Sequence, residues 1–161
     1  MPNLPIRAIV IHCTASATTT TRAKVDSWHK ARGFSGIGYH WLLHQERDGR
    51  IVIEAGRAES VQGAHARVGG YNSHTLGICC AGDPRGGHPW SPEQRKALVA
   101  LIADRCRAHR LTSANVYGHC ETDPEHRPDC PGVDMDALRA DVAVALGEKG
   151  EHPATSAPHT S

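Results

Sequence analysis

The chain has neither an excess of charge of one sign nor a long apolar run. Its 161 residues include 18 Lys and Arg and 17 Asp and Glu, which gives a net charge of +1, and no basic stripe or charge block occurs. Nucleic acid is therefore not a favoured partner. No apolar stretch approaches the roughly 20 residues that a membrane-spanning helix needs, so we also expect no membrane partner.

The sequence also predicts no secretory signal. The first residues, MPNLPIRAIVIHC, lack a charged segment followed by an apolar segment and a small-residue cleavage site, which predicts synthesis in the cytoplasm. Disulfide scaffolds are usually secreted, shorter and denser in cysteine, and the adjacent Cys79 and Cys80 would make an awkward framework. We therefore expect the six cysteines to be reduced thiols.

What the sequence does contain is an alternation of strand patterns and helix patterns. Strands are predicted for three segments, residues 6–14, 76–82 and 115–120. Two further strands, joined at Asp48-Gly49, are predicted within residues 38–56. Helices are predicted for three segments, residues 18–33, 91–110 and 134–146. A hairpin within this alternating order predicts an α/β fold with a mixed central sheet flanked by helices.

The length suits a single domain with one core. We expect this domain to cover residues 1–147. Residues 148–161 have little apolar content, which predicts a disordered C-terminal tail. Within the domain, residues 60–75 are rich in glycine and polar residues and follow no period. They are predicted to form a loop that is long enough to suggest a functional role.

Three possible zinc ligands lie at the ends of predicted strands or in a loop near the end of the chain. His12 lies near the end of the first strand, His119 closes the strand at residues 115–119, and Cys130 lies in a proline-braced loop before Pro131-Gly132. Neighbouring strands could present the two imidazoles side by side, and three protein ligands would leave a fourth tetrahedral position for water. Taken singly, a histidine near a strand end is more often polar surface.

The other cysteines do not share this pattern. Cys13 and Cys120 each follow a candidate histidine, and successive side chains of a strand face opposite ways, so we expect both to fill the core. Glu121 and Asp123 are expected to cap or brace their loop rather than to act in catalysis.

Four segments together resemble a known family. They are, in order, VIHCTAS, GIGYHWLLHQERDGRI, GAHARVGGYNSHTLGICCAGD and YGHCETDPEHRPDCPG. They look like the zinc-dependent N-acetylmuramoyl-L-alanine amidases of type 2, a family that includes short phage lysozymes and peptidoglycan recognition proteins. The resemblance runs from about Ile6 to Leu146. It implies that His12, His119 and Cys130 bind Zn²⁺ in a cleft at the strand ends of the mixed sheet.

The resemblance also implies roles for residues around the metal. Tyr39, in the GYH motif, would donate a hydrogen bond to the oxyanion that forms when an amide carbonyl is attacked; otherwise it is a core aromatic. His65 and Asn72, in the long loop, would contact substrate or form a cleft wall. Their alternative is to stabilise the loop.

One position departs from the family pattern. Many members carry Lys or Thr two residues before the third ligand, where this chain has Pro128, which offers neither a side-chain donor nor an N–H. The neighbouring Arg127 could supply a permanent positive charge to the oxyanion, or it could be a solvated surface residue. His126 is another possible proton carrier.

The predicted reaction is hydrolysis of the amide between N-acetylmuramic acid and L-alanine, with peptidoglycan or a muropeptide as substrate. Such an enzyme would be a phage endolysin that acts on the cell wall or an amidase that recycles wall fragments, and we expect a monomer. Two other classes stay open. One is a non-catalytic peptidoglycan-binding module of the same fold, and the other is a structural zinc protein with Cys120 or His126 as fourth ligand.

Overall fold

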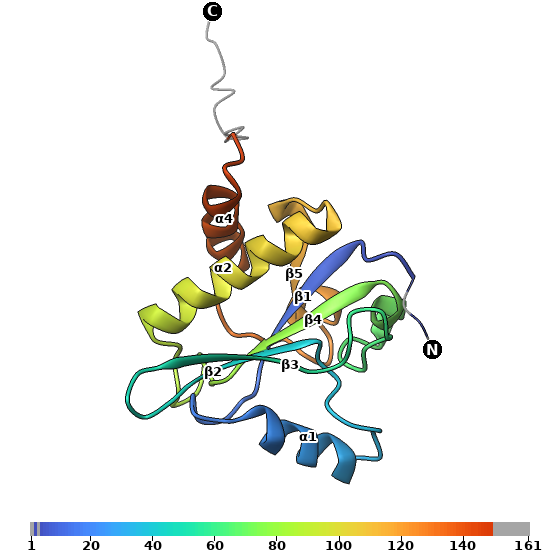
Figure 1. Ribbon diagram of the computed structural model, residues 1–161, viewed down its shortest axis with the longest axis vertical. Coiled ribbons are helices and arrows are strands. Elements are labelled where there is room, and N and C mark those ends of the chain that lie inside the picture. Colours follow the sequence, from blue (N-terminus) through green and yellow to red (C-terminus); the bar gives the residue numbers. More distant parts are fainter. Residues whose placement is uncertain (1, 3, 150–161) are drawn as a thin grey trace, which may run out of the picture.

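Five strands form one mixed sheet in the order β3-β2-β4-β1-β5 (Figure 1). The computed structural model describes residue 2 and residues 4–149. The strands are β1 (Ala8–Cys13), β2 (Trp41–Gln45), β3 (Ile51–Ala55), β4 (Thr75–Cys80) and β5 (Val116–Gly118). All neighbouring pairs are parallel except β2 and β3, which form the antiparallel hairpin that the sequence predicts. The α/β prediction is confirmed.

Strand β1 is an interior strand of the sheet, between β4 and the edge strand β5, and all six of its residues are buried. Its register pairs His12 with Cys79 and Ile11 with Gly118. Because parallel strands end at the same edge, the carboxyl ends of β1, β4 and β5 meet there. His119 directly follows Gly118 and therefore comes next to His12.

Helices cover both faces of the sheet (Figure 1). They are α1 (Arg22–Ala31), α2 (Pro92–His109), α3 (His119–Thr122) and α4 (Met135–Leu146), with 3₁₀ turns η1 (Val68–Ser73) and η2 (Ser113–Asn115). Helices α2 and α4 lie on one face, and α1 lies on the other. None of the helices in the described part of the chain is long and apolar enough to cross a bilayer.

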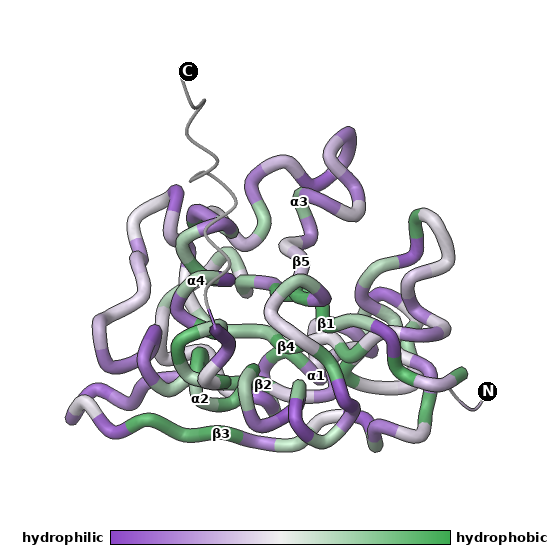
Figure 2. The backbone as a smooth tube through the Cα atoms, turned by 90° about the horizontal axis from the view of Figure 1, so that it is seen from above, coloured by the Kyte–Doolittle hydropathy of each residue, from purple (hydrophilic) through white to green (hydrophobic). Residues whose placement is uncertain are grey.

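Successive side chains of a strand point to opposite faces of the sheet, so the sheet has a hydrophobic core on each face. Leu43 of β2 packs with the apolar residues of α2 and α4, whereas the preceding Leu42 packs with Val25 of α1. Figure 2 shows hydrophobic segments along the central strands and mostly hydrophilic loops around them. The strand that carries His12 is therefore part of a sheet with a packed hydrophobic core on each face.

Two predicted segments differ from the structure. Residues 115–120 were expected to be one strand, but β5 ends at Gly118, and His119 is the first residue of the short helix α3. The loop at residues 60–75 contains the 3₁₀ turn η1 and the start of β4. Of the predicted tail, residues 150–161 lie outside the described residues.

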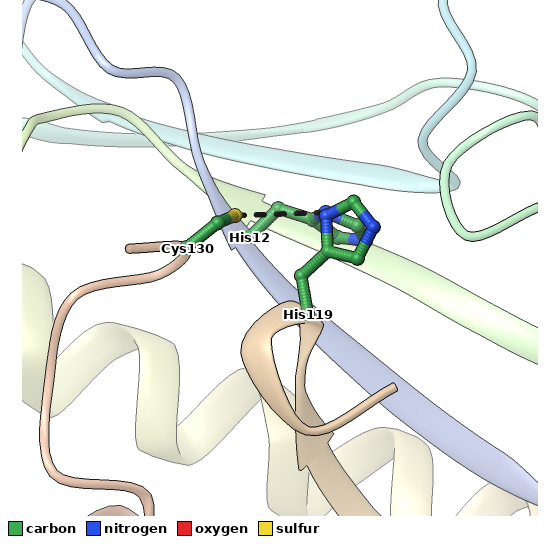
Figure 3. A group of neighbouring side chains, drawn as sticks. All are labelled: His12, His119 and Cys130. Atoms are coloured by element: carbon green, nitrogen blue, oxygen red, sulfur yellow. Dashed lines mark hydrogen bonds between the residues drawn. The ribbon is translucent and has the colours of Figure 1, made fainter. Parts of the chain in front are cut away.

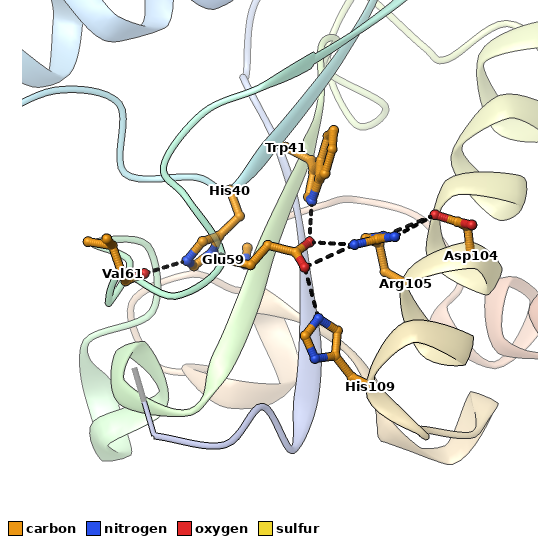
Figure 4. Close-up of polar contacts among 8 residues, drawn as sticks. His40, Trp41, Glu59, Val61, Asp104, Arg105 and His109 are labelled. Carbon is orange, nitrogen blue, oxygen red and sulfur yellow. Dashed lines mark hydrogen bonds and ion pairs between the residues drawn. The ribbon is translucent and has the colours of Figure 1, made fainter. Parts of the chain in front are cut away.

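Glu59 ties the connection between β3 and β4 to helix α2 (Figure 4). Trp41 Nε1 donates to one carboxylate oxygen at 2.6 Å, and Arg105 Nη1 donates to both at 2.9 and 3.1 Å. His109 Nε2 lies 2.9 Å from the carboxylate. Burial alone would raise the pKa of Glu59, but the hydrogen bonds from Trp41, His109 and Arg105 outweigh it and lower the pKa.

We expect Glu59→Gln to lower the free energy of unfolding by about 2 kcal/mol at pH 7, because hydrogen bonds to a charged group are lost. The folded-state pKa of Glu59 lies below its unfolded value. Its contribution is therefore present above the unfolded pKa and disappears as the pH falls through the folded pKa. Urea unfolding of both proteins from neutral to acidic pH measures this difference. A gap that persists unchanged in acid would contradict the assignment to the carboxylate.

Candidate metal centre and cleft

A cleft of about 1230 Å³ opens at the carboxyl end of β1. Its floor includes His12, Cys13 and Tyr39, and its walls come from segments far apart in the sequence. These wall segments are the end of α1 with Phe34, the loop at residues 64–72, the turn after β4 at residues 83–86, and residues 119–130. All the predicted site residues line this one cleft.

His12, His119 and Cys130 point toward one another at the floor of the cleft (Figure 3). One potential ligand atom from each lies within 4.8 Å of the others. His12 Nδ1 is 3.9 Å from Cys130 Sγ, and the rings of His12 and His119 are 4.5 Å apart. The histidines are 1% and 9% exposed. The convergence that the sequence predicts is present in the structure.

The protonation states of these groups suit a metal site. Burial, together with the neighbouring His65 and His119, lowers the pKa of His12 well below its usual value. Burial and the charge of Arg127 lower the pKa of His119 to about 4. Both imidazoles are therefore neutral at pH 7, which is the form that binds metal. Two neutral imidazoles and a thiol are a donor set that fits zinc.

The Cys130 thiol has a second thiol beside it. Hydrogen bonding with Cys13, followed by burial, raises the pKa of Cys130. A metal ion would therefore bind Cys130 by displacing its proton. Cys13 is 8% exposed and lines the cleft rather than facing away from it, so the expectation that it only fills the core was incomplete. Cys120 does pack against the core on the α2 side, as expected.

The loop that carries Cys130 is braced by its acidic residues. Cys120 N–H donates to Cys130 O at 2.7 Å, which joins the two ends of the loop. Glu121 accepts from Gly118 N–H at 2.9 Å and pairs with Arg139 of α4 at 2.6 Å. Asp123 accepts from the backbone N–H of His126 at 3.2 Å. These contacts agree with the bracing role that the sequence suggests for both acids.

His65 and Asn72 hold the loop wall of the cleft. His65 is 8% exposed, and its Nδ1 lies 2.9 Å from His12 Nε2. Burial lowers the pKa of His65 to about 3, so its ring is neutral. Asn72 Oδ1 accepts from the backbone N–H groups of His65 and Ala66 at 2.8 and 2.7 Å. These contacts stabilise the loop, and direct substrate contact by either residue stays a prediction.

Tyr39 borders the same group of side chains from the segment before β2. Its ring lies 4.9 Å from that of His12. Burial, with the thiols of Cys79 and Cys130 nearby, raises the pKa of Tyr39 well above its usual value. The phenol is therefore protonated at neutral pH and can donate a hydrogen bond. A Cβ on the neighbouring Gly38 would come within 2.1 Å of the Ala64 carbonyl oxygen, which explains the glycine in the motif.

Comparison with known proteins identifies the family. The sequence model of the type 2 family described as N-acetylmuramoyl-L-alanine amidase matches residues 2–133. The chain belongs to this amidase family. It is 34% identical over 140 residues to the endolysin of Enterobacteria phage T3. This alignment covers 83% of this chain and 85% of that protein. It is 31% identical over 134 residues to the endolysin of Escherichia phage T7, with 80% and 82% covered.

A solved structure agrees with the assignment. The N-acetylmuramoyl-L-alanine amidase LysC from Clostridium intestinale URNW superimposes with a TM-score of 0.71 and 29% identity. The match covers 91% of this chain and 89% of that one. The resemblance that the sequence motifs carry is therefore confirmed, both for the fold and for membership of the amidase family.

The residues around Pro128, where this chain departs from the family pattern, lie at the rim of the amidase cleft. His126, Arg127 and Pro128 are all exposed. Arg127 Nη1 donates to His126 O at 3.4 Å, and its positive charge helps to lower the pKa of both candidate histidine ligands. Arg127 lines the same cleft as the candidate ligands, and its catalytic role stays a prediction. His126 Nδ1 lies 2.9 Å from Asp123 Oδ1.

A closed four-ligand site finds no support here. In the described part of the chain, one group of His, Cys, Asp and Glu side chains is placed to hold a metal ion. It consists of His12, His119 and Cys130. Cys120 lies against the core, and His126 is exposed on the rim. Three candidate ligands at the floor of an open cleft are compatible with the three-ligand arrangement of catalytic zinc sites.

Proposed function

We propose that His12, His119 and Cys130 hold one zinc ion with which the amidase hydrolyses the bond between N-acetylmuramic acid and L-alanine. The observation that carries this proposal is the approach of two neutral imidazoles and a thiol to within 4.8 Å at the floor of the cleft. The substrate is peptidoglycan or a muropeptide derived from it, as the family membership supports.

Zinc with three protein ligands acts as a Lewis acid and lowers the pKa of water to about 7, which suits attack on an amide at neutral pH. The protein's own groups handle the charge that develops on the carbonyl oxygen. Tyr39, protonated and beside His12, donates a hydrogen bond to that oxygen. Arg127 on the rim adds a positive charge, which takes the place of the side-chain donor that Pro128 lacks.

Two observations favour an enzyme over a non-catalytic binding module. The thiol ligand is retained and lies beside His12, and Tyr39 is placed at the same floor. The curated relatives are named endolysins, which supports a lytic role against the cell wall rather than recycling of wall fragments. We further propose that the chain acts as a monomer made in the cytoplasm.

The function can be tested with purified cell walls. We expect the protein to release soluble fragments and to free the amino group of L-alanine, which dansyl labelling detects. A chelator should stop the release, and added zinc should restore it. Sedimentation with the walls without release would indicate the binding module. Neither binding nor release would indicate a structural zinc protein, and release without new L-alanine amino groups would contradict amidase activity.

A further inference from the structure

The two nitrogens of His12 face different partners. Nδ1 points toward Cys130 Sγ at 3.9 Å, on the side where the candidate ligands converge. Nε2 lies 2.9 Å from His65 Nδ1, on the other side of the ring. A neutral imidazole carries one proton, so His12 can bind metal through Nδ1 only if that proton is on Nε2.

The direction of each hydrogen bond behind His12 follows from a backbone carbonyl. Thr75 Oγ1 lies 2.7 Å from Tyr71 O, and because a carbonyl only accepts, the Thr75 hydroxyl proton is used there. Thr75 Oγ1 therefore accepts from His65 Nε2, which lies 3.4 Å away. With its proton on Nε2, His65 has a free lone pair on Nδ1. His12 Nε2 must then donate to it.

The ring of His65 has little freedom to move from this position. A Cβ on Gly77 would lie 2.6 Å from the ring, and a Cβ on Gly63 would lie 2.5 Å from it. The ring of His40 packs against its edge at 5.8 Å between centroids. His40 is itself fixed between Gly77 N–H at 3.0 Å and Val61 O at 2.8 Å. The absence of a side chain at these two glycines leaves the space that the ring of His65 occupies.

We propose that Thr75 and His65 form a hydrogen-bond relay that fixes the proton of His12 on Nε2 and presents Nδ1 to zinc. His65 is thereby a positioning residue for the metal, in addition to being part of the cleft wall. This inference rests on the proposed function, because it requires zinc at His12. Partners of this kind, behind a ligating imidazole, typically change metal affinity about 10–100-fold when they are removed.

Two matched pairs of variants test the relay. His65→Leu removes the acceptor, whereas His65→Asn places an amide oxygen near the position of Nδ1. Thr75→Val removes the hydroxyl at similar volume, whereas Thr75→Ser keeps it. Zinc dissociation constants, measured by competition with a chelating dye, should rise about 10–100-fold in His65→Leu and recover largely in His65→Asn. Thr75→Val should show a smaller rise, and Thr75→Ser should match the parent protein.

Nitrogen-15 NMR of the histidine-labelled, zinc-loaded parent protein provides a second readout, since it reports which nitrogen carries the proton. We expect a protonated Nε2 and a metal-bound Nδ1 for His12. A proton on Nδ1, or unchanged zinc affinity in a folded His65→Leu protein, would overturn the relay. If His65→Leu does not fold, the Thr75 pair and the NMR measurement decide. A parent protein that binds no zinc would instead contradict the proposed function.

Discussion

Replacing Cys130 by alanine is expected to abolish both zinc retention and amide hydrolysis. The thiol is one of three groups that meet at the floor of the cleft, and the two histidines alone cannot complete the site. If a zinc binding energy of about 10–16 kcal/mol is shared among the ligands, losing one costs about 4 kcal/mol, or roughly a thousandfold in affinity. Metal analysis after dialysis and the wall-release assay measure the two effects.

The neighbouring cysteine provides a matched control for this variant. Cys120→Ala removes a thiol ten residues away, at the other end of the same loop, that packs against the core instead of the site. This variant should keep one equivalent of zinc and most of its activity. His12→Ala should lose zinc as Cys130→Ala does. A full equivalent of zinc in both ligand variants would show that the metal binds elsewhere.

Replacing Tyr39 by phenylalanine should lower kcat by about 10²–10³-fold, the usual loss when one oxyanion donor is removed. The ring and its packing against His12 are retained, so zinc content and KM should change little. Because the pKa of Tyr39 is raised, the phenol stays protonated and able to donate throughout the neutral range. Kinetics on a soluble muropeptide separate kcat from KM.

The alternative for Tyr39, a core aromatic, predicts a different result. In that case Tyr39→Phe would keep kcat close to that of the parent protein, since the hydroxyl would have no part in the reaction. Tyr71→Phe is a suitable control, because Tyr71 uses its backbone carbonyl in the loop behind the site. That variant should have the kcat of the parent protein.

The convergence of His12, His119 and Cys130 could be predicted in outline from the sequence. Apolar patterns identify β1 and β5, and parallel strands end at a common edge, so two histidines near those ends fall close together. Spacing alone left the ligand set open, because local sequence patterns do not predict where the loop places Cys130 relative to the strand ends. The four motifs of the family supplied that missing long-range information.

The remaining errors have physical causes. His119 begins a four-residue helix instead of ending a strand, and so short an element has too few residues to show a period. Cys13 is the last residue of β1, and the Cys130 loop folds around that end to meet its thiol. Strand alternation describes the two faces of a sheet and gives no information about contacts beyond its edge.

The position of His65 behind His12 was also missed. Its loop follows no hydrophobic period. The contact depends on how the loop packs against β4, and local sequence patterns do not specify this packing. One signal could have suggested it. Gly77 lies in the middle of a buried strand, where glycine often marks the close approach of another group, and that group is the ring of His65.

X-ray absorption at the zinc edge, on protein loaded with one equivalent of zinc, tests the ligand set most directly. We predict one sulfur neighbour at about 2.3 Å and nitrogen or oxygen neighbours at about 2.0–2.1 Å, two of them with the scattering pattern of imidazole. A spectrum without sulfur, or with two sulfur neighbours, would contradict a site made of His12, His119 and Cys130.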